Sequence, residues 1–263
     1  MAFNKNELVL DKVRSLVAND LSTGEMLFRL TSLEDPTLTC TAEGDEVADA
    51  VGAVITTLYR SKKATFSATN SLISLDLAAA QYGSKKEVAG ADNKMLDYTY
   101  EVLTVPADTE TVKLSHKPSS KDDVKFIYSI ENGEVGKSFK AGSVASATEF
   151  VIADDGTITV PTGLTGKIFV EYQFETENAV RIVNKASEFP ESCSVVIYAY
   201  FRDKCNDNVV YSGKIICPKA KLNPESVELA LTSTGKHAFE MTMMKDYCED
   251  EGNDQLFTII VAE

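Results

Sequence analysis

The residues from Ala53 to Ala68 form an unusually long extended run, and this run limits the possible folds more than any other feature of the chain. Its second half alternates apolar Ala64, Phe66 and Ala68 with polar residues, so one face is apolar and the other is polar. The apolar residues around the start of the run also fit helical spacing, but Gly52 interrupts them and Val-Ile-Thr-Thr favours a strand. Most strands have about 5–6 residues. We therefore expect one long strand that projects beyond its sheet.

A short helix is predicted directly after the long strand. Asn70 or Ser71 is placed to cap its first turn, and Gly83 is placed to end it. The apolar residues between these positions that share one helical face are Leu72, Leu75 and Ala79. No other segment combines a cap, an amphipathic face and a stop signal in this way.

The rest of the two outer portions of the chain predicts strands and hairpins. Polar turn residues separate the apolar groups, which is typical of antiparallel β-structure. The expected pairs and strands are a hairpin within Leu8–Leu30, a short strand at Thr37–Thr41, Ser194–Arg202 with Val209–Ile216, Val227–Leu231 with Ala238–Met244, and a final strand at Leu256–Val261. Because the final strand is expected to close the first sheet, its deletion should destabilise the whole domain.

The segment from Leu96 to Phe174 has a different sequence pattern, with shorter strand-like runs at closer spacing. The expected strands are Thr111–Leu114, Val124–Ile130, Glu149–Ile152, Thr157–Val160 and Lys167–Phe174. This spacing fits a small β-sandwich or barrel-like module of about 75–80 residues. We expect residues 96–175 to be a module inserted into a discontinuous β domain made of residues 1–95 and 176–263.

Composition and charge exclude several classes of function. The chain has 263 residues, 44% of them hydrophobic and 25% charged, which is typical of a folded globular protein. It carries 40 acidic and 26 basic residues and a formal net charge of −14, which disfavours binding to phosphate backbones. A negative wall also allows DNA to pass without sticking. A nucleic-acid reader is therefore not expected.

No signal for export, for a membrane or for a cofactor is found. The first residues lack the basic start and apolar core of a secretory signal, and there is no run of about 18 apolar residues. We expect a protein made in a cytoplasm, with no membrane partner. The five cysteines include no Cys-x-x-Cys pair, so neither a disulfide framework, a metal site nor a cofactor is expected.

Catalytic signatures are equally weak. The two histidines, His116 in a Pro-flanked loop and His237 in a predicted turn, have no serine or cysteine motif around them. Gly133–Ser138 ends like a phosphate loop but has two residues between its glycines where four are required, so we interpret it as a hairpin turn. The densest acidic patch contains Glu249, Asp250, Glu251 and Asp254. It fits a solvated loop, a weak cation site or a repulsive acidic rim.

A basic cluster lies on the long strand of this acidic protein. Arg60, Lys62 and Lys63 follow Tyr59 and precede the apolar alternation. They fit either a polar strand face or a contact with acidic residues of an adjoining subunit, since complementary charge selects partner and register. The candidate interface residues are Tyr59, Arg60, Lys62, Lys63, Glu46 and Asp49.

Three blocks of the sequence resemble bacteriophage tail tube proteins. They are Tyr59–Asn70, then Leu77–Ser84, and finally Ala220–Pro224 with Leu229–Gly235. The resemblance covers the two outer portions of the chain and includes no catalytic signature. It implies a mainly β fold with two packed antiparallel sheets flanked by one α-helix, to which the inserted module would be an addition.

The resemblance also implies a function and partners. Proteins of this kind assemble with copies of themselves into hexameric rings, which stack into a tube. The implied role is a virion structural protein of the tail that contacts other tail proteins and lets DNA pass through its lumen without sequence-specific binding. The physical chemistry agrees, because unpaired strand edges can be completed by neighbouring copies.

Two other functions stay open. An adhesion or decoration protein built of β-sandwich modules would hold a capsid, a cell surface or a glycan, and residues 96–174 alone would then retain full partner affinity. An enzyme with an acidic site, such as a glycan hydrolase, would need two carboxylates in a cleft. The sequence nominates no such pair, and the absence of tryptophan weakens the case for a sugar-binding platform in such an enzyme.

Overall fold

The computed structural model describes residues 7–106, 108–206, 208–225, 227–231, 235–247 and 254–262. As predicted, the chain is mainly β, and its described part contains one α-helix. It divides into two compact units. The first unit comprises Met1–Lys86 and Ile182–Glu263, and the second comprises Glu87–Arg181. No helix in the described ranges is long and apolar enough to cross a membrane.

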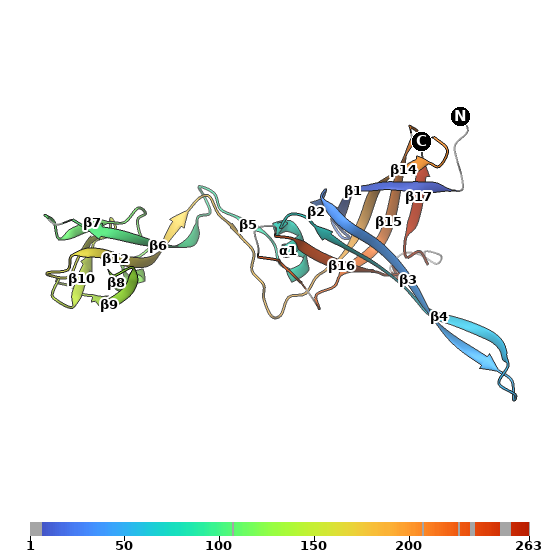
Figure 1. Ribbon diagram of the computed structural model, residues 1–263, viewed down its shortest axis with the longest axis horizontal. Coiled ribbons are helices and arrows are strands. Elements are labelled where there is room, and N and C mark those ends of the chain that lie inside the picture. Colours follow the sequence, from blue (N-terminus) through green and yellow to red (C-terminus); the bar gives the residue numbers. More distant parts are fainter. Residues whose placement is uncertain are drawn as a thin grey trace. The chain divides into compact units, whose positions relative to one another are not determined.

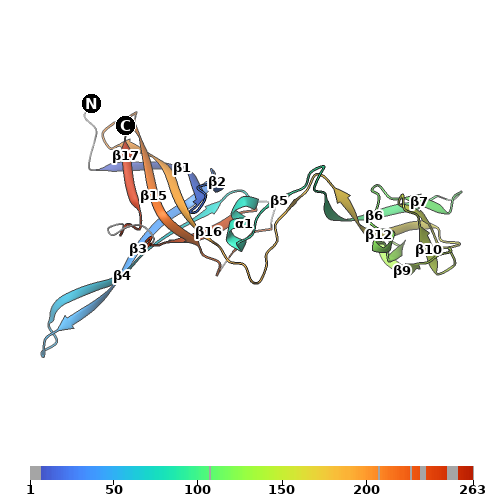
Figure 2. The ribbon, with the colours of Figure 1, turned by 180° about the vertical axis from the view of Figure 1, so that it is seen from behind.

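The first unit is built on an eight-stranded sheet, which is seen from two sides in Figures 1 and 2. Its strands are β1 (Leu8–Asp20), β2 (Met26–Leu30), β3 (Leu33–Ala48), β4 (Val54–Asn70), β14 (Ser192–Asp203), β15 (Val210–Leu222), β16 (His237–Met243) and β17 (Thr258–Ala262). They are ordered β2-β1-β14-β15-β16-β4-β3, and β17 also pairs with β15. The described strands thus form one hydrogen-bonded sheet, and the expected arrangement of two packed sheets is not confirmed.

The hairpins of the first unit are mostly those predicted. β1 pairs antiparallel with β2 and β14 with β15, and β17 extends the sheet along β15. The prediction that Val227–Leu231 is a strand paired with the following strand is wrong. Within the described residues of this segment, only Leu229 bridges to His237. The long ladder of β16 is instead with β4, from His237 opposite Asn70 to Met243 opposite Ala64.

Helix α1 (Leu75–Tyr82) begins later than predicted. Its N-cap is Ser74, whose Oγ accepts the backbone N–H of Leu77. Asn70 and Ser71 do not cap it, since Asn70 is the last residue of β4 and the Ser71 N–H donates to the carbonyl oxygen of Ser32. The predicted end is confirmed, because Gly83 has a φ of 67° at the C-cap.

The core of the first unit lies on one face of the sheet and is closed by α1. Alternate residues of the strands are buried, including Leu16, Phe28, Phe66 and Ile197, and Leu77 joins them from the helix. Burial of such side chains is the main source of stability, at about 1.5–3 kcal/mol each.

The second unit contains a seven-stranded sheet and a separate two-stranded one. The larger sheet has the order β6-β12-β8-β9-β10-β11-β7, and β5 (Glu87–Val88) pairs with β13 (Val180–Arg181). The strands of the larger sheet are β6 (Met95–Val105), β7 (Thr111–Lys113), β8 (Phe126–Glu131), β9 (Glu134–Ala141), β10 (Glu149–Ile152), β11 (Thr157–Thr159) and β12 (Gly166–Thr176), and a 3-10 turn, η1, spans Lys121–Asp123. Five of these strands overlap predicted ones, whereas β6 and β9 were not predicted.

The turn between β8 and β9 explains one of these differences. Asn132 and Gly133 have φ values of 55° and 87°, as a tight two-residue hairpin requires. The predicted turn is therefore confirmed, but it ends at Gly133. Residues Glu134 to Ser138, interpreted from the sequence as part of the turn, belong to β9.

A buried polar pair joins α1 to β16. His237, predicted to lie in a turn, is the first residue of β16 and has no exposed surface. Its Nδ1 accepts the backbone N–H of Ser74 at 3.4 Å, so Nε2 carries the proton and donates to Oε1 of Gln81. Gln81 in turn donates to the carbonyl oxygen of Ala238. The role of Gln81 could not be predicted from the sequence, because its partners lie more than 150 residues away.

Lowering the pH is expected to destabilise the first unit through His237. Burial lowers the pKa of this side chain below its ordinary value of about 6.5. Below about pH 6.5 the unfolded chain therefore takes up the proton first, and stability falls by up to about 1.4 kcal/mol per pH unit until the pKa of the folded state is reached. Above about pH 6.5 this contribution is complete. Urea unfolding between pH 5 and 7.5 should show a smaller pH dependence for His237→Gln, and equal dependence in both proteins would contradict the assignment.

Candidate assembly interface

The ends of β3 and β4 form a two-stranded projection with almost no burial. From Thr41 to Lys63 every residue is exposed except Thr57, which is half-buried. The next residue of β4 that faces the sheet interior, Ala64, already belongs to the core. Figure 1 shows this pair of strands extending away from the other strands of its unit. We call residues 41–63 the arm.

The arm begins at a β-bulge. Thr41 pairs with Lys63 and Glu43 pairs with Arg60, so that the single residue between them on β3 faces two residues of β4. One of these two, Ser61, has a φ of 52°. Bulges bend a strand and increase its twist. The projection expected from the sequence is thus confirmed. Residues 45–48 of β3, which were not predicted to be a strand, also pair with β4.

Large apolar side chains cover the arm. Their exposed fractions run from 42% for Val47 to 91% for Val51. The members of this apolar set are Val47, Val51, Val54, Ile55, Leu58 and Tyr59. An isolated two-stranded hairpin is marginally stable in water, and contiguous exposed apolar surface marks interaction sites. The arm is therefore chemically suited to be covered by another protein surface.

The charged residues nominated for the interface all lie on the arm, and two of them are engaged locally. Arg60 Nε lies 3.7 Å from a carboxylate oxygen of Asp45. Asp49 accepts the backbone N–H groups of Val51 and Ala53, which shapes the tip. A surface pair of this kind adds little stability.

The other nominated charges of the arm form no ion pair with the described residues. Among the residues that the structure describes, Glu46, Lys62 and Lys63 have no ion pair within 4 Å. Tyr59 lies opposite Gly44. Its ring packs so closely over this glycine that a Cβ added at Gly44 would lie 3.2 Å from it. The arm thus presents free cations, a free carboxylate and an exposed aromatic ring together.

The predicted acidic rim is only partly described. Glu249, Asp250 and Glu251 lie outside the described residues. Asp254 forms an ion pair with Lys245. The rim therefore stays a prediction.

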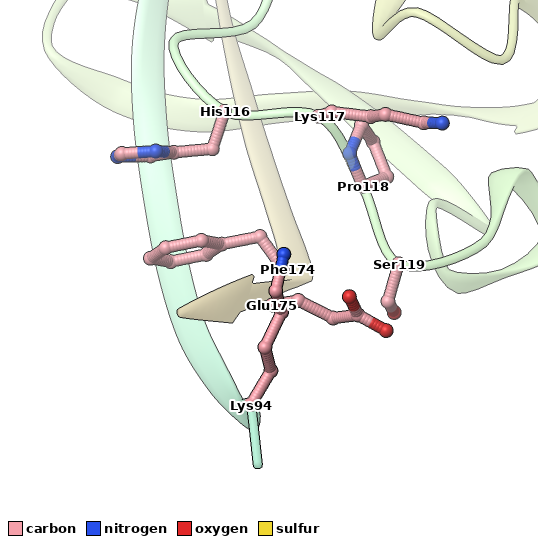
Figure 3. A pocket seen from close by; sticks show the side chains of 7 residues that line it. All are labelled: Lys94, His116, Lys117, Pro118, Ser119, Phe174 and Glu175. Atoms are coloured by element: carbon pink, nitrogen blue, oxygen red, sulfur yellow. The ribbon is translucent and has the colours of Figure 1, made fainter. Parts of the chain in front are cut away.

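The second unit has a cavity of about 350 Å³ near the end of β12, shown in Figure 3. The His116 ring stacks on Phe174, with centroids 4.1 Å apart and planes inclined by 12°. Ser119 lines the same cavity, but its hydroxyl donates to Asp123. In the described part of the chain no hydrogen bond joins His116 to a serine or cysteine, so this cavity does not assemble a nucleophile with a base.

The buried thiols are also poorly suited to chemistry. Burial raises the pKa of Cys193 to about 11 and that of Cys217 to about 12. Both thiols therefore stay protonated near neutral pH, whereas the thiolate is the reactive form. Within the described ranges, no three His, Cys, Asp or Glu residues are grouped to hold a metal ion.

The chain was also compared with known proteins. The sequence profile of the YomU/Tube protein family matches residues 8–256, which include the arm, the second unit and most of the first unit. A search of curated proteins gave no match.

Proposed function

The chain belongs to the YomU/Tube protein family and is a phage tail tube-like structural protein, and from this premise we propose that it is the subunit that polymerises into stacked hexameric rings to form the conduit for DNA ejection. The observation that carries the proposal is the exposed apolar arm. A surface of this kind is completed by neighbouring copies, and head-to-tail contacts generate rings and filaments.

The open margins of the first unit support the same role. β2 and β3 are the edge strands of the sheet, and β17 carries the exposed side chains Ile259 and Ile260. Exposed edges are templates for pairing with another chain. Residues 96–175 are, in this proposal, a module inserted into the tube-forming domain of residues 1–95 and 176–263.

The charge of the chain fits a DNA conduit. A formal net charge of −14 opposes binding of phosphate backbones. DNA would therefore slide through the lumen without sequence-specific contacts. Other tail proteins would contact the ends of the tube, and assembly would take place in the host cytoplasm.

Electron microscopy of the purified full-length protein tests the proposal. Negatively stained samples over a range of protein and salt concentrations should contain rings or tubes. Particles that stay strictly monomeric under all of these conditions would overturn it.

Reversing the basic charges of the arm is expected to impair assembly without unfolding the monomer. In the triple variant Arg60→Glu, Lys62→Glu and Lys63→Glu, the arm would repel the acidic surface of a neighbouring copy. Exposed charges contribute little to folding stability. Sedimentation should show less polymer, and thermal unfolding should stay cooperative.

The matched control reverses three exposed lysines of the second unit, Lys117, Lys121 and Lys167. It changes the net charge equally. If it reduces the polymer as much as the arm variant does, total charge and not the arm controls assembly.

A further inference from the structure

The outer face of β6, β12 and β8 in the second unit carries a cluster of aromatic side chains. Tyr100 of β6 lies opposite Glu171 of β12, and Phe169 of β12 lies opposite Tyr128 of β8. Tyr98, two residues from Tyr100 on the same side of β6, is 70% exposed, and Tyr100 is 67% exposed. We call this surface the aromatic face. Its members are Tyr98, Tyr100, Phe126, Tyr128 and Phe169.

The rings of the aromatic face hold one another in place. Tyr100 stacks on Phe169 with centroids 5.6 Å apart and planes inclined by 25°. Tyr128 packs against the same Phe169 ring at 6.2 Å and 59°. The alternate residues Ile168 and Val170 are fully buried on the other side of β12. The face is therefore a supported platform on a regular strand.

A shallow cavity of about 220 Å³ adjoins this platform. Three rings of the face, Tyr98, Phe126 and Tyr128, line it. Its polar lining comes from Asp123, Lys125, Glu171 and Gln173. Ligand sites commonly combine aromatic walls with a few polar groups that fix orientation.

Three of the four polar side chains are free to bind. In the described part of the chain, the side chains of Lys125, Glu171 and Gln173 have no hydrogen bond or ion pair to another residue. Asp123 differs, because its Oδ2 accepts the backbone N–H of Ser120. The free set includes a cationic donor, an anionic acceptor and an amide that donates and accepts.

We propose that the aromatic face and its cavity bind a neutral pyranose sugar unit of a glycan, a function that goes beyond tube formation and does not depend on it. A pyranose ring has an apolar C–H face that packs on an aromatic ring and hydroxyl groups at its rim. Those hydroxyls both donate and accept, which matches the mixed polar set around the rings. The carboxylates of Glu171 and Asp123 outnumber the one cation, Lys125, and so disfavour an acidic sugar.

A protein partner fits this face less well. Glu171 lies among Tyr100, Phe126 and Phe169 in the middle of the face, where a protein interface would remove it from water. Burial of an unpaired carboxylate is costly, and the centres of protein interfaces are depleted in charge. A bound glycan leaves part of the face exposed to solvent, and its hydroxyl groups can donate hydrogen bonds to the carboxylate of Glu171.

The test is retention of the full-length protein on four insoluble neutral glycans: cellulose, chitin, amylose and a galactan. Binding to at least one is expected, and the double variant Tyr98→Ala, Tyr100→Ala should weaken it at least tenfold. Tyr100→Phe keeps the ring and should bind normally. Tyr247→Ala, which removes a tyrosine of the first unit that is even more exposed, should also leave binding unchanged.

Three results would overturn the proposal. The first is absence of binding to all four glycans. The second is binding that the double variant does not change. The third is self-association by light scattering that the double variant abolishes while no glycan binds, because the face would then contact a second copy of the chain. Unchanged thermal unfolding of the double variant would show that lost binding does not come from misfolding, since both tyrosines are exposed.

Discussion

Replacing the apolar tip of the arm with polar residues of similar strand propensity is expected to raise the protein concentration needed for polymerisation at least about a hundredfold. The variant is Val51→Thr, Ile55→Thr and Tyr59→Thr. All three side chains are more than half exposed in the subunit. They therefore contribute little to its folding, whereas a few anchor residues at the centre of an interface, with tyrosine prominent among them, each contribute about 2 kcal/mol or more. A loss of only about 2.7 kcal/mol of binding free energy raises the dissociation constant of the interface a hundredfold.

The same variant should fold normally. Threonine is β-branched and favours strands, and exposed substitutions usually change stability by about 0.5 kcal/mol or less. Polymer formation is measured by sedimentation and electron microscopy over a concentration series, and folding is measured by circular dichroism during heating.

A control removes apolar surface elsewhere. Val135→Thr and Val144→Thr change exposed valines of the second unit and should leave the polymer intact. Normal polymerisation of the arm variant would contradict the role of the arm. A large decrease in the melting temperature of the arm variant would show instead that the tip is packed within the subunit.

Substituting Gly83 with alanine is expected to destabilise the first unit by about 2–5 kcal/mol. Gly83 has a positive φ of 67°, and an added Cβ would lie 2.2 Å from the carbonyl oxygen of Phe189. The left-handed conformation costs a residue with a Cβ about 1–2 kcal/mol. The clash adds to this cost because backbone atoms must shift, and overpacking typically costs about 1–3 kcal/mol. A loss of this size lowers the melting temperature by about 10 °C.

Gly24 provides the matched control, because it shares the backbone conformation without the clash. Its φ is 74°, and no atom lies within 4 Å of an added Cβ. Gly24→Ala should therefore cost only about 1–2 kcal/mol. Urea unfolding of both variants separates the two terms, and equal losses would mean that the contact with Phe189 is not rigid.

Local patterns in the sequence were enough to predict many elements of the fold. The alternation through Phe66 predicts β4, Gly83 predicts the end of α1, and Gly133 predicts the turn after β8. Each signal acts within a few residues, through side-chain alternation or through a backbone angle that glycine adopts at no cost. Candidate interface residues on the arm such as Arg60 and Lys63 could also be nominated from the sequence, because they lie next to the alternating part of the same strand.

Elements that depend on distant partners could not be predicted in this way. β6 has mixed apolar and polar residues on both faces, and its strand conformation follows from its ladder with β12, from Met95 to Val105. The helix start moved to Ser74 because β4 remains paired through Asn70. The aromatic face was also hidden, since Tyr100 and Tyr128 are brought to the same ring, Phe169, only by strand pairing.

The sequence by itself determined the β-rich class, the long strand with its following helix, the turns and the acidic charge, because these depend on short-range geometry and on composition. Only the tertiary structure decided that the eight described strands of the first unit form one sheet, that His237 is buried against Gln81, and that the apolar residues of the arm are exposed. The physical reason is that an apolar residue in a strand has the same local pattern whether its own chain or another molecule covers it. Burial is a property of the partners that the fold brings together.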